Sequence, residues 1–323
     1  MHYIGIDASG AYMRLVAADD EMRVIGKHTS AKNRVELHHA PHDAPKPGGG
    51  ERVRDNARRL LFEFNKLTST MLTDCAGLCF GSNSADSPEK LRALGEALGD
   101  LVDCPVLFIN SARMVVSAHT RGGAGVALYA GNTVSACAVS EAGESFNCGS
   151  YGARLSDAGA VGIALAAVKA ALYSADGAAP PTPLTGTIRE YFRLPALRDI
   201  IDKIHNNQTD DDALAGVSLL VKRAADEGDE TSLEIERAAA RSLAKTAAAV
   251  TRLAGLSAPS VVVSGGVFLT NERLTGVFAE ELSALLPGAS AAPLKEKPAM
   301  GALYLAIKAG ADYAAARKEK KRK

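Results

Sequence analysis

The first residue with the chemistry of a site is Asp7, which ends the apolar run at residues 3–6. A buried carboxylate is costly unless a cation meets it, and Mg²⁺ is held by carboxylate oxygens, often with water in between. The small residues Ala8, Ser9 and Gly10 follow at once. Asp7 is therefore either a water-mediated Mg²⁺ ligand beside a phosphate or a side-chain cap of its own turn. The two turns described next favour the metal.

Two later apolar strands, at residues 126–129 and 261–263, also run into small residues. Turns without bulky side chains let backbone N–H groups approach an anion closely. The predicted contacts are phosphates at Ser9, Gly10, Gly131, Asn132 and Thr133, and a planar base at Gly265 and Gly266. At each turn the alternative is an ordinary connection where strand and helix approach closely.

Residues 149–157 contain side chains of the types that bind sugars. Tyr151 offers a flat apolar face with a polar tip, which suits stacking on a sugar ring. Asp157 can accept hydrogen bonds from sugar hydroxyls. Core packing is the alternative role of Tyr151.

These residues need a scaffold of alternating strands and helices. We expect strands at 3–6, 12–18, 23–27, 78–80, 106–109, 126–130, 134–139 and 261–263, and helices at 52–68, 111–119, 159–172, 231–253 and 300–309, with a further helix starting at Pro88. Each half of the chain begins with strands and continues with alternating helix and strand. The pattern indicates a weak internal duplication of an α/β unit.

The composition limits the class of protein. The chain has 323 residues, which favours two domains, and is 47% hydrophobic and 23% charged. Lys plus Arg and Asp plus Glu both number 37, so the net charge of zero argues against binding nucleic acid over a whole surface. The basic residues 317–323 are predicted to be a disordered tail.

The expected cellular compartment rests on the cysteines and on the lack of leader and membrane-span patterns. The five cysteines show no zinc spacing and are expected to be small buried side chains in a reducing cytosol. No leader pattern opens the chain, and no apolar run reaches the roughly 20 residues of a membrane span. We expect a cytoplasmic protein with no membrane contact.

Seven motifs follow the order and spacing of a known family over residues 2–310: YIGIDASG, LCFGS, LFINSA, GVALYAGNTVSA, GSYGARLSDAG, VVVSGGV and KPAMGALYLA. On these motifs the chain resembles the N-acetylglucosamine kinase/BadF–BcrA-type ATPase family of the sugar kinase–Hsp70–actin superfamily. The resemblance implies two α/β domains of the ribonuclease-H-like, actin-like ATPase type around an interdomain cleft, with ATP and Mg²⁺ as cofactors. We expect domains at 1–112 and 113–304, with a helix at 305–323 packing back on the first.

Some positions of this chain match the functional residues of the family, and others differ. Asp7 matches the first-strand aspartate, Gly10 the end of the first phosphate loop, and Gly265–Gly266 the adenosine turn. The family's loop Gly-Gly-Gly-Thr-Lys-Thr reads Ala-Ser-Gly-Ala-Tyr-Met at 8–13, so the threonine and the basic residue are gone. The family's Gly-Thr-Gly-Ser appears as Gly-Asn-Thr-Val at 131–134, and its Gly-Trp-Gly as Ser-Tyr-Gly at 150–152.

The largest departure concerns the catalytic base. The family's Asn-Asp pair, whose aspartate is the base toward the sugar hydroxyl, is Asn110 and Ser111 here. A serine cannot take that proton near neutral pH without a base of its own. Asp157 is retained, although the family's following glutamate is Ala158, and is the best stand-in. The sugar contacts implied by the resemblance are Asn110, Ser150, Tyr151 and Asp157.

The function that we expect is ATP-dependent phosphorylation of a sugar or amino sugar, as in N-acetylglucosamine kinases. Two alternatives stay open. One is a catalytically degenerate kinase homologue that binds nucleotide or sugar as a regulatory protein. The other is a BadF-type ATPase that activates a partner enzyme, a branch that normally carries cluster-binding cysteines in a pattern not seen here. The expected partner is a small-molecule sugar rather than nucleic acid, and a homodimer is kept open.

Overall fold

The computed structural model describes residues 1–9, 12–29, 49–69, 72–82 and 88–320. The chain divides into two compact units, residues 1–124 with 294–323 (unit 1) and residues 125–293 (unit 2). These bounds differ from those expected at 112 and 304. Residues 113–124 and the start of the last helix belong to unit 1, because α3 (Ser111–Thr120) and α12 (Pro298–Lys320) pack on each other and on the first sheet.

Unit 1 begins with the antiparallel meander expected from the sequence. Its strands are β1 (His2–Asp7), β2 (Arg14–Asp19), β3 (Val24–Thr29), β4 (Cys75–Gly81) and β5 (Val106–Ile109). They form one sheet in the order β3-β2-β1-β4-β5, in which β1, β2 and β3 are antiparallel neighbours and β4 and β5 join β1 in parallel.

Alternating side chains of β1 build a core on each face of this sheet. Ile4 and Ile6 join Phe64 in the core beneath α1 (Gly49–Thr68) and α2 (Pro88–Leu98). Tyr3 joins Leu303 in the core beneath α3 and α12. The sheet is therefore covered by helices on both faces, which leaves its strand ends as the place for polar residues.

Unit 2 repeats the strand order of unit 1. Its strands are β6 (Gly125–Ala130), β7 (Val134–Val139), β8 (Ser145–Gly149), β9 (Ser260–Ser264) and β10 (Ser290–Pro293). They lie in the order β8-β7-β6-β9-β10, again with three antiparallel strands followed by two parallel ones. The internal duplication expected from the sequence is thus confirmed in the topology of the two sheets.

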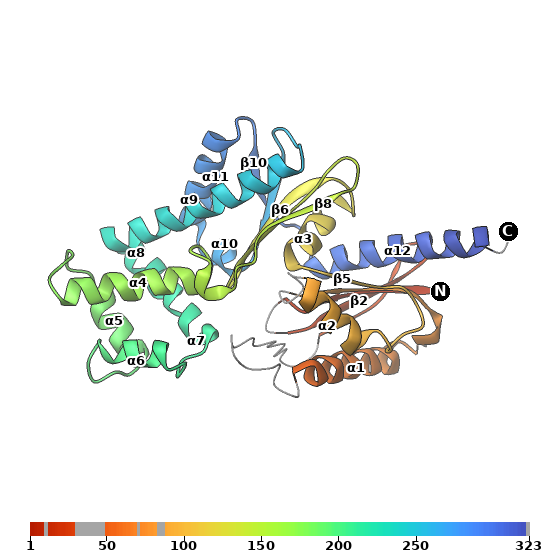
Figure 1. Ribbon diagram of the computed structural model, residues 1–323, viewed down its shortest axis with the longest axis horizontal. Coiled ribbons are helices and arrows are strands. Elements are labelled where there is room, and N and C mark those ends of the chain that lie inside the picture. The colour runs from red at the N-terminus through yellow and green to blue at the C-terminus, as the bar shows by residue number, and fades with distance from the viewer. Residues whose placement is uncertain (10–11, 30–48, 70–71, 83–87, 321–323) are drawn as a thin grey trace. The chain divides into compact units, whose positions relative to one another are not determined.

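The helices of unit 2 fall into three groups. The long helix α9 (Glu230–Leu253) packs on β6, β7 and β8 and on α11 (Glu272–Leu285). The short helix α10 (Gly266–Thr270) follows β9. Between the sheet strands, the chain adds α4 (Ala160–Ala175), α5 (Leu184–Tyr191), α6 (Asp199–His205), α7 (Asp211–Ala215) and α8 (Val217–Asp226) (Figure 1).

The structure also bears on three expectations outside the sheets, which concern the C-terminal tail, membrane spans and the cysteines. The prediction of a disordered tail from residue 317 is wrong up to Lys320, because α12 continues through these residues and Arg317 lies over the Tyr313 ring. In the described part of the chain, no helix has the length and apolarity needed to cross a membrane. Cys75, Cys79 and Cys137 are buried, as expected, whereas Cys104 and Cys148 are partly exposed.

Candidate functional site

The carboxyl ends of three parallel strands bring together the candidates of unit 1. Asp7 ends β1, and it pairs in register with Gly81 of β4, which pairs with Ile109 of β5. The Ala8 N–H donates to the Gly81 carbonyl at 2.7 Å, which extends the ladder into the turn. Asn110 and Ser111 follow Ile109, so these polar residues and Asp7 share one edge of the sheet. Gly10 lies outside the described residues.

Asp7 is a buried carboxylate whose two oxygens face different groups. Its Oδ1 accepts hydrogen bonds from the Ser9 N–H, at 2.9 Å, and from the Ser9 hydroxyl, so it does cap its own turn. Its Oδ2 lies 3.8 Å from Nη1 of Arg14. Burial raises the pKa of Asp7, while the bonds from Ser9 and the charge of Arg14 lower it. Among the described residues, Oδ2 has the ion pair with Arg14 and no hydrogen bond, so it is the oxygen that would hold a Mg²⁺ ion through water.

Asn110 and Ser111 occupy the start of α3. The Asn110 Oδ1 accepts the Arg113 N–H at 2.7 Å and caps the helix. Ser111 is the first helical residue and is buried. Within the described residues, no group of three His, Cys, Asp or Glu side chains converges to hold a metal ion directly. The edge of unit 1 therefore offers one carboxylate, a serine and an amide.

The turn after β6 is fixed by α4. The Gly131 N–H donates to the Thr133 carbonyl at 3.0 Å, and the Gly131 carbonyl accepts the Ala160 N–H at 2.8 Å. The Thr133 hydroxyl lies 3.1 Å from the Ser156 hydroxyl, and the Asn132 amide donates to Asp212 at 2.7 Å. The Gly131 amide is therefore used inside the turn, and donors for a phosphate have to come from its neighbours.

Gly265 and Gly266 differ in their surroundings. Gly265 has φ +101°, and a Cβ there would lie 2.3 Å from the carbonyl oxygen of Ala130, so this glycine is needed where β9 and β6 approach closely. A Cβ on Gly266 would meet no atom within 4 Å. Close packing, the alternative role, accounts for Gly265, whereas Gly266 leaves open space at the start of α10 as a ligand contact requires.

Two of the predicted sugar residues, Ser150 and Tyr151, lie in a strained turn after β8. Ser150 has φ +63°, between Gly149 at +80° and Gly152 at +86°. Non-glycine residues rarely adopt this conformation, and it is common at functional sites. Tyr151 is 69% exposed, so the core-packing alternative for its ring is wrong.

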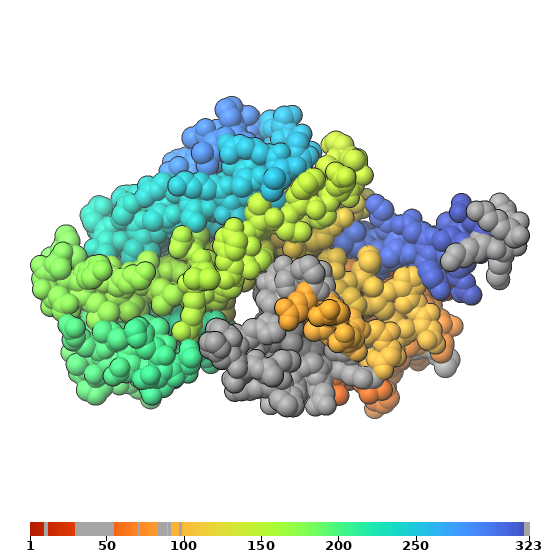
Figure 2. Space-filling view, viewed as in Figure 1, coloured from red at the N-terminus to blue at the C-terminus, as the bar shows by residue number. Residues whose placement is uncertain are grey.

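Asp157 lines a groove in unit 2. The groove has a volume of about 780 Å³ and runs between α4 and α9, which lie side by side in the space-filling view (Figure 2). Asp157 is exposed, and Gly162 lets its segment lie against α4, because a Cβ there would clash with the Ser156 carbonyl. Arg154 also lines the groove and is paired with Asp211 at 3.2 Å.

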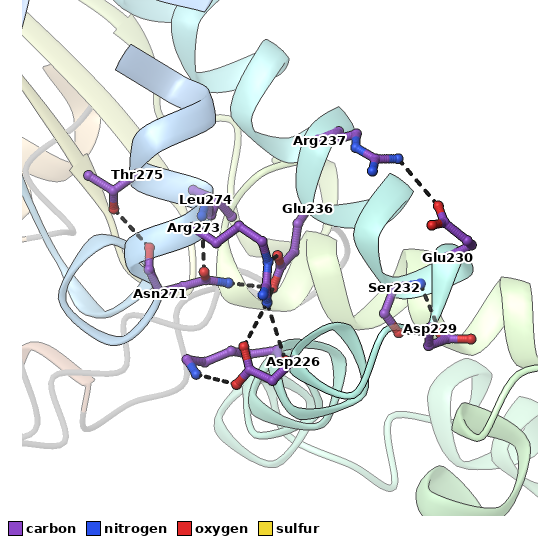
Figure 3. A network of polar contacts seen from close by, with 11 residues as sticks. Asp226, Asp229, Glu230, Ser232, Glu236, Arg237, Asn271, Arg273, Leu274 and Thr275 are labelled. Carbon is purple, nitrogen blue, oxygen red and sulfur yellow. Dashed lines mark hydrogen bonds and ion pairs between the residues drawn. The ribbon is translucent and has the colours of Figure 1, made fainter. Parts of the chain in front are cut away.

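A buried polar network fixes the segment that follows Gly266. Glu236 of α9 is buried and accepts hydrogen bonds from the Asn271 amide and from Nε of Arg273, the latter at 2.7 Å (Figure 3). Asn271 caps α11 through the Leu274 N–H at 3.0 Å, and Arg273 also pairs with Asp226 of α8 at 2.9 Å. These contacts hold α10 and α11 against α8 and α9.

The sequence reasoning missed Arg14 and Glu236. The signal for Arg14 was its place as the first cation after a small turn, and an antiparallel pairing of the two strands would have set it opposite Asp7. Glu236 lies on the buried face of α9 with Ala239, Ala240 and Leu243, where an acidic residue is rare unless it has a partner.

Comparisons with known proteins extend over most of the chain. The sequence profile of the BadF/BadG/BcrA/BcrD ATPase family matches residues 4–306. An N-acetylmuramic acid/N-acetylglucosamine kinase from Clostridium acetobutylicum is 25% identical over 260 residues, 79% of this chain and 85% of that protein. An N-acetyl-D-glucosamine kinase from Dictyostelium discoideum is 25% identical over 315 residues, 94% of this chain and 97% of that protein.

Solved structures show the same fold. A putative N-acetylglucosamine kinase from Chromobacterium violaceum superposes with a TM-score of 0.74 at 16% identity, covering 95% of this chain and 98% of that one. A ROK family glucokinase from Streptomyces griseus, in complex with glucose and AMPPNP, gives a TM-score of 0.55 at 14% identity, covering 96% and 99%.

Proposed function

The chain belongs to the BadF/BadG/BcrA/BcrD ATPase family, and on this premise we propose that it transfers the terminal phosphoryl group of ATP to a hydroxyl of a sugar or amino sugar. The observation that carries the proposal is that each unit gathers its predicted residues at the carboxyl edge of its own sheet. In unit 1 the edge holds Asp7, Asn110 and Ser111, and in unit 2 the turn after β6 meets the start of α4. The kinase names of the two relatives support the sugar as acceptor.

The nucleotide residues have distinct roles in this proposal. Gly266 leaves room for the adenosine, since its Cα faces open space. Ser9, Asn132 and Thr133 lie beside the phosphates. Asp7 holds Mg²⁺ through water, and the ion supplies charge neutralisation at the phosphates when it is bound.

The sugar is held by the exposed ring of Tyr151, by Ser150 and Asp157, and by the amide of Asn110. Asp157 is the only predicted sugar residue with a carboxylate, so we assign it the task of taking the proton from the attacking hydroxyl. A general base contributes about 10²- to 10⁴-fold to such a step. Transfer is therefore expected to be slow if Asp157 serves in place of a base at position 111.

One observation favours a second candidate function. Ser111, a residue without a carboxylate, begins α3 where the resemblance places the base. A protein that binds ATP and sugar without transfer, and reports on them to a partner, accounts for this substitution. The third candidate, an ATPase that activates a partner enzyme through an iron–sulfur cluster, predicts bound iron in the purified protein.

The test is ADP release from Mg-ATP by the purified full chain, with and without N-acetylglucosamine. Sugar-dependent, sustained ADP release together with a phosphorylated sugar in the product supports the kinase. Calorimetric binding of sugar and nucleotide with no turnover supports the regulatory protein. The colour and iron content of the purified protein test the third candidate, and light scattering on the same sample tests the homodimer that the sequence leaves open.

A further inference from the structure

Arg14 stands directly across from Asp7 at the turn end of the first hairpin. It is the first residue of β2, and the register pairs it with Asp7, the last residue of β1. Side chains paired across antiparallel strands lie on the same face of the sheet. Residues 8–13, which connect the two strands, contain no Lys or Arg. The first cation after this turn is thus placed beside the carboxylate that ends β1.

The two partners of this pair differ sharply in exposure. The Asp7 side chain is 2% exposed and the Arg14 side chain 43%. Their separation of 3.8 Å exceeds the roughly 2.7–2.9 Å of a close charge-assisted hydrogen bond. Among the described residues, Asp7 is the only group with which the guanidinium pairs. Most of its N–H donors therefore remain available to an acceptor from outside the chain.

Phosphate is the acceptor that this position suits. A guanidinium presents N–H donors in a planar fork that matches phosphate oxygens. Terminal phosphates close to an ionised Asp7 would be repelled unless a cation lay between or beside them. Arg14 provides that cation, because its guanidinium lies against Asp7 and reaches solvent at the same edge of the sheet.

We propose that Arg14 binds the terminal phosphates of ATP and supplies the positive charge that the preceding turn lacks. The inference rests on the proposed function, which sets the phosphates beside Asp7 and Ser9, but it concerns binding and not transfer. The inference adds the side chain of Arg14, on β2, to the turn after β1 as a contact of the terminal phosphates.

The experiment is calorimetric titration of the full chain with ATP, ADP and AMP in Mg²⁺ buffer without sugar, for the wild type, Arg14→Gln and Arg14→Lys. Loss of the charged contact in Arg14→Gln is expected to weaken ATP binding about 10- to 100-fold. The same substitution is expected to weaken ADP binding less, and to leave AMP binding unchanged, because these nucleotides lack one or both of the terminal phosphates. Arg14→Lys restores part of the ATP affinity, because lysine keeps the charge but not the fork.

Arg23→Gln is the matched control. Arg23 lies just before β3 in the same meander, pairs with Asp19 at 2.8 Å and Glu21 at 3.1 Å, and is 70% exposed. The Arg23→Gln variant is expected to bind ATP, ADP and AMP with the same affinity as the wild type. Melting curves without nucleotide show whether Arg14→Gln is folded like the wild type.

Four outcomes decide the matter. An Arg14→Gln variant that binds ATP as tightly as the wild type overturns the inference. Equal losses for ATP, ADP and AMP together with a lower melting temperature also overturn it, since they indicate a purely structural pair. A wild type that binds ATP through Arg14 but phosphorylates no sugar supports the inference and refutes the proposed kinase. A wild type that binds no ATP refutes both.

Discussion

The side-chain amide of Asn271 donates a hydrogen bond to the buried carboxylate of Glu236 and so joins the start of α11 to the middle of unit 2. Arg273 donates to the other carboxylate oxygen, so Glu236 satisfies two polar groups at the start of α11. Gly266 begins the short helix α10, which leads directly into the start of α11. We therefore expect the position of Gly266, the proposed adenosine contact, to depend on this network.

Removal of this carboxylate is expected to destabilise unit 2. Glu236→Ala leaves Asn271 and Arg273 without their buried acceptor, which costs about 3–5 kcal/mol of the free energy of unfolding. Chemical denaturation of the full chain measures the loss. Glu234→Ala on the same helix is the control, because its pairs with Arg237 and Arg241 are exposed and worth about 0–1 kcal/mol. Equal effects of the two substitutions would contradict the role of the network.

The two glycines after β9 are expected to separate stability from ligand binding. Gly265→Ala forces a side chain into a left-handed conformation and against the Ala130 carbonyl, so it lowers the free energy of unfolding by about 2 kcal/mol or more. Gly266→Ala meets no protein atom and leaves stability within about 0.5 kcal/mol. It is expected to weaken ATP binding, measured by calorimetry. If Gly266→Ala binds ATP normally, adenosine does not lie at this turn.

Restoring an acid at the start of α3 tests the account of the missing base. Ser111→Asp is expected to raise sugar-dependent ADP release about 10²-fold or more if the remaining site is sound. Ser111→Asn has nearly the same shape without the proton acceptor and serves as the control. An unchanged rate in Ser111→Asp, with the variant folded and binding ATP, would show that the base is not what limits transfer.

Asp7 is expected to make unit 1 more stable in acid. Burial raises the folded pKa of Asp7 above its unfolded value, so the folded state binds the proton more tightly. The resulting stability is fully present below the unfolded pKa, about 3.9, and is lost as pH rises through the folded pKa. Asp7→Asn removes this dependence and raises the free energy of unfolding at neutral pH by about 1 kcal/mol.

The measurement is the free energy of unfolding of wild type and Asp7→Asn from about pH 4 to about pH 8, the range above the unfolded aspartate pKa. Asp20→Asn, on the exposed turn between β2 and β3, is the control and is expected to follow the wild-type curve. Parallel curves for the wild type and Asp7→Asn would contradict the effect of burial on the Asp7 carboxyl.

Strong patterns predicted most of the scaffold. The alternating strands, the alanine-rich helices α4 and α9, and the proline that begins α2 were visible because period and end signals agree. The helices between Leu184 and Asp226 were missed, since several have only one or two turns and are held by packing on α4 and α9. The strand β8 was missed for a related reason: it is short and partly exposed.

The candidate site was predicted less completely than the scaffold. Small residues mark a turn, but they do not tell which amide is already used, as Gly131 shows, or which glycine serves packing, as Gly265 shows. Arg14 and Glu236 depend on contacts with partners 7 and 35 residues away. Such contacts arise from strand register and helix packing, which local sequence patterns do not determine.

Each half of the chain completes its own sheet from its own strands, in the same order. Mutations can therefore accumulate in one half without breaking the backbone pairing of the other. Departures from the family motifs fall in both units, at residues 8–13 and Ser111 in unit 1 and at residues 131–134 and 150–152 in unit 2. A lineage built on this plan can therefore exchange residues at its strand ends many times over, while the two sheets that carry them persist.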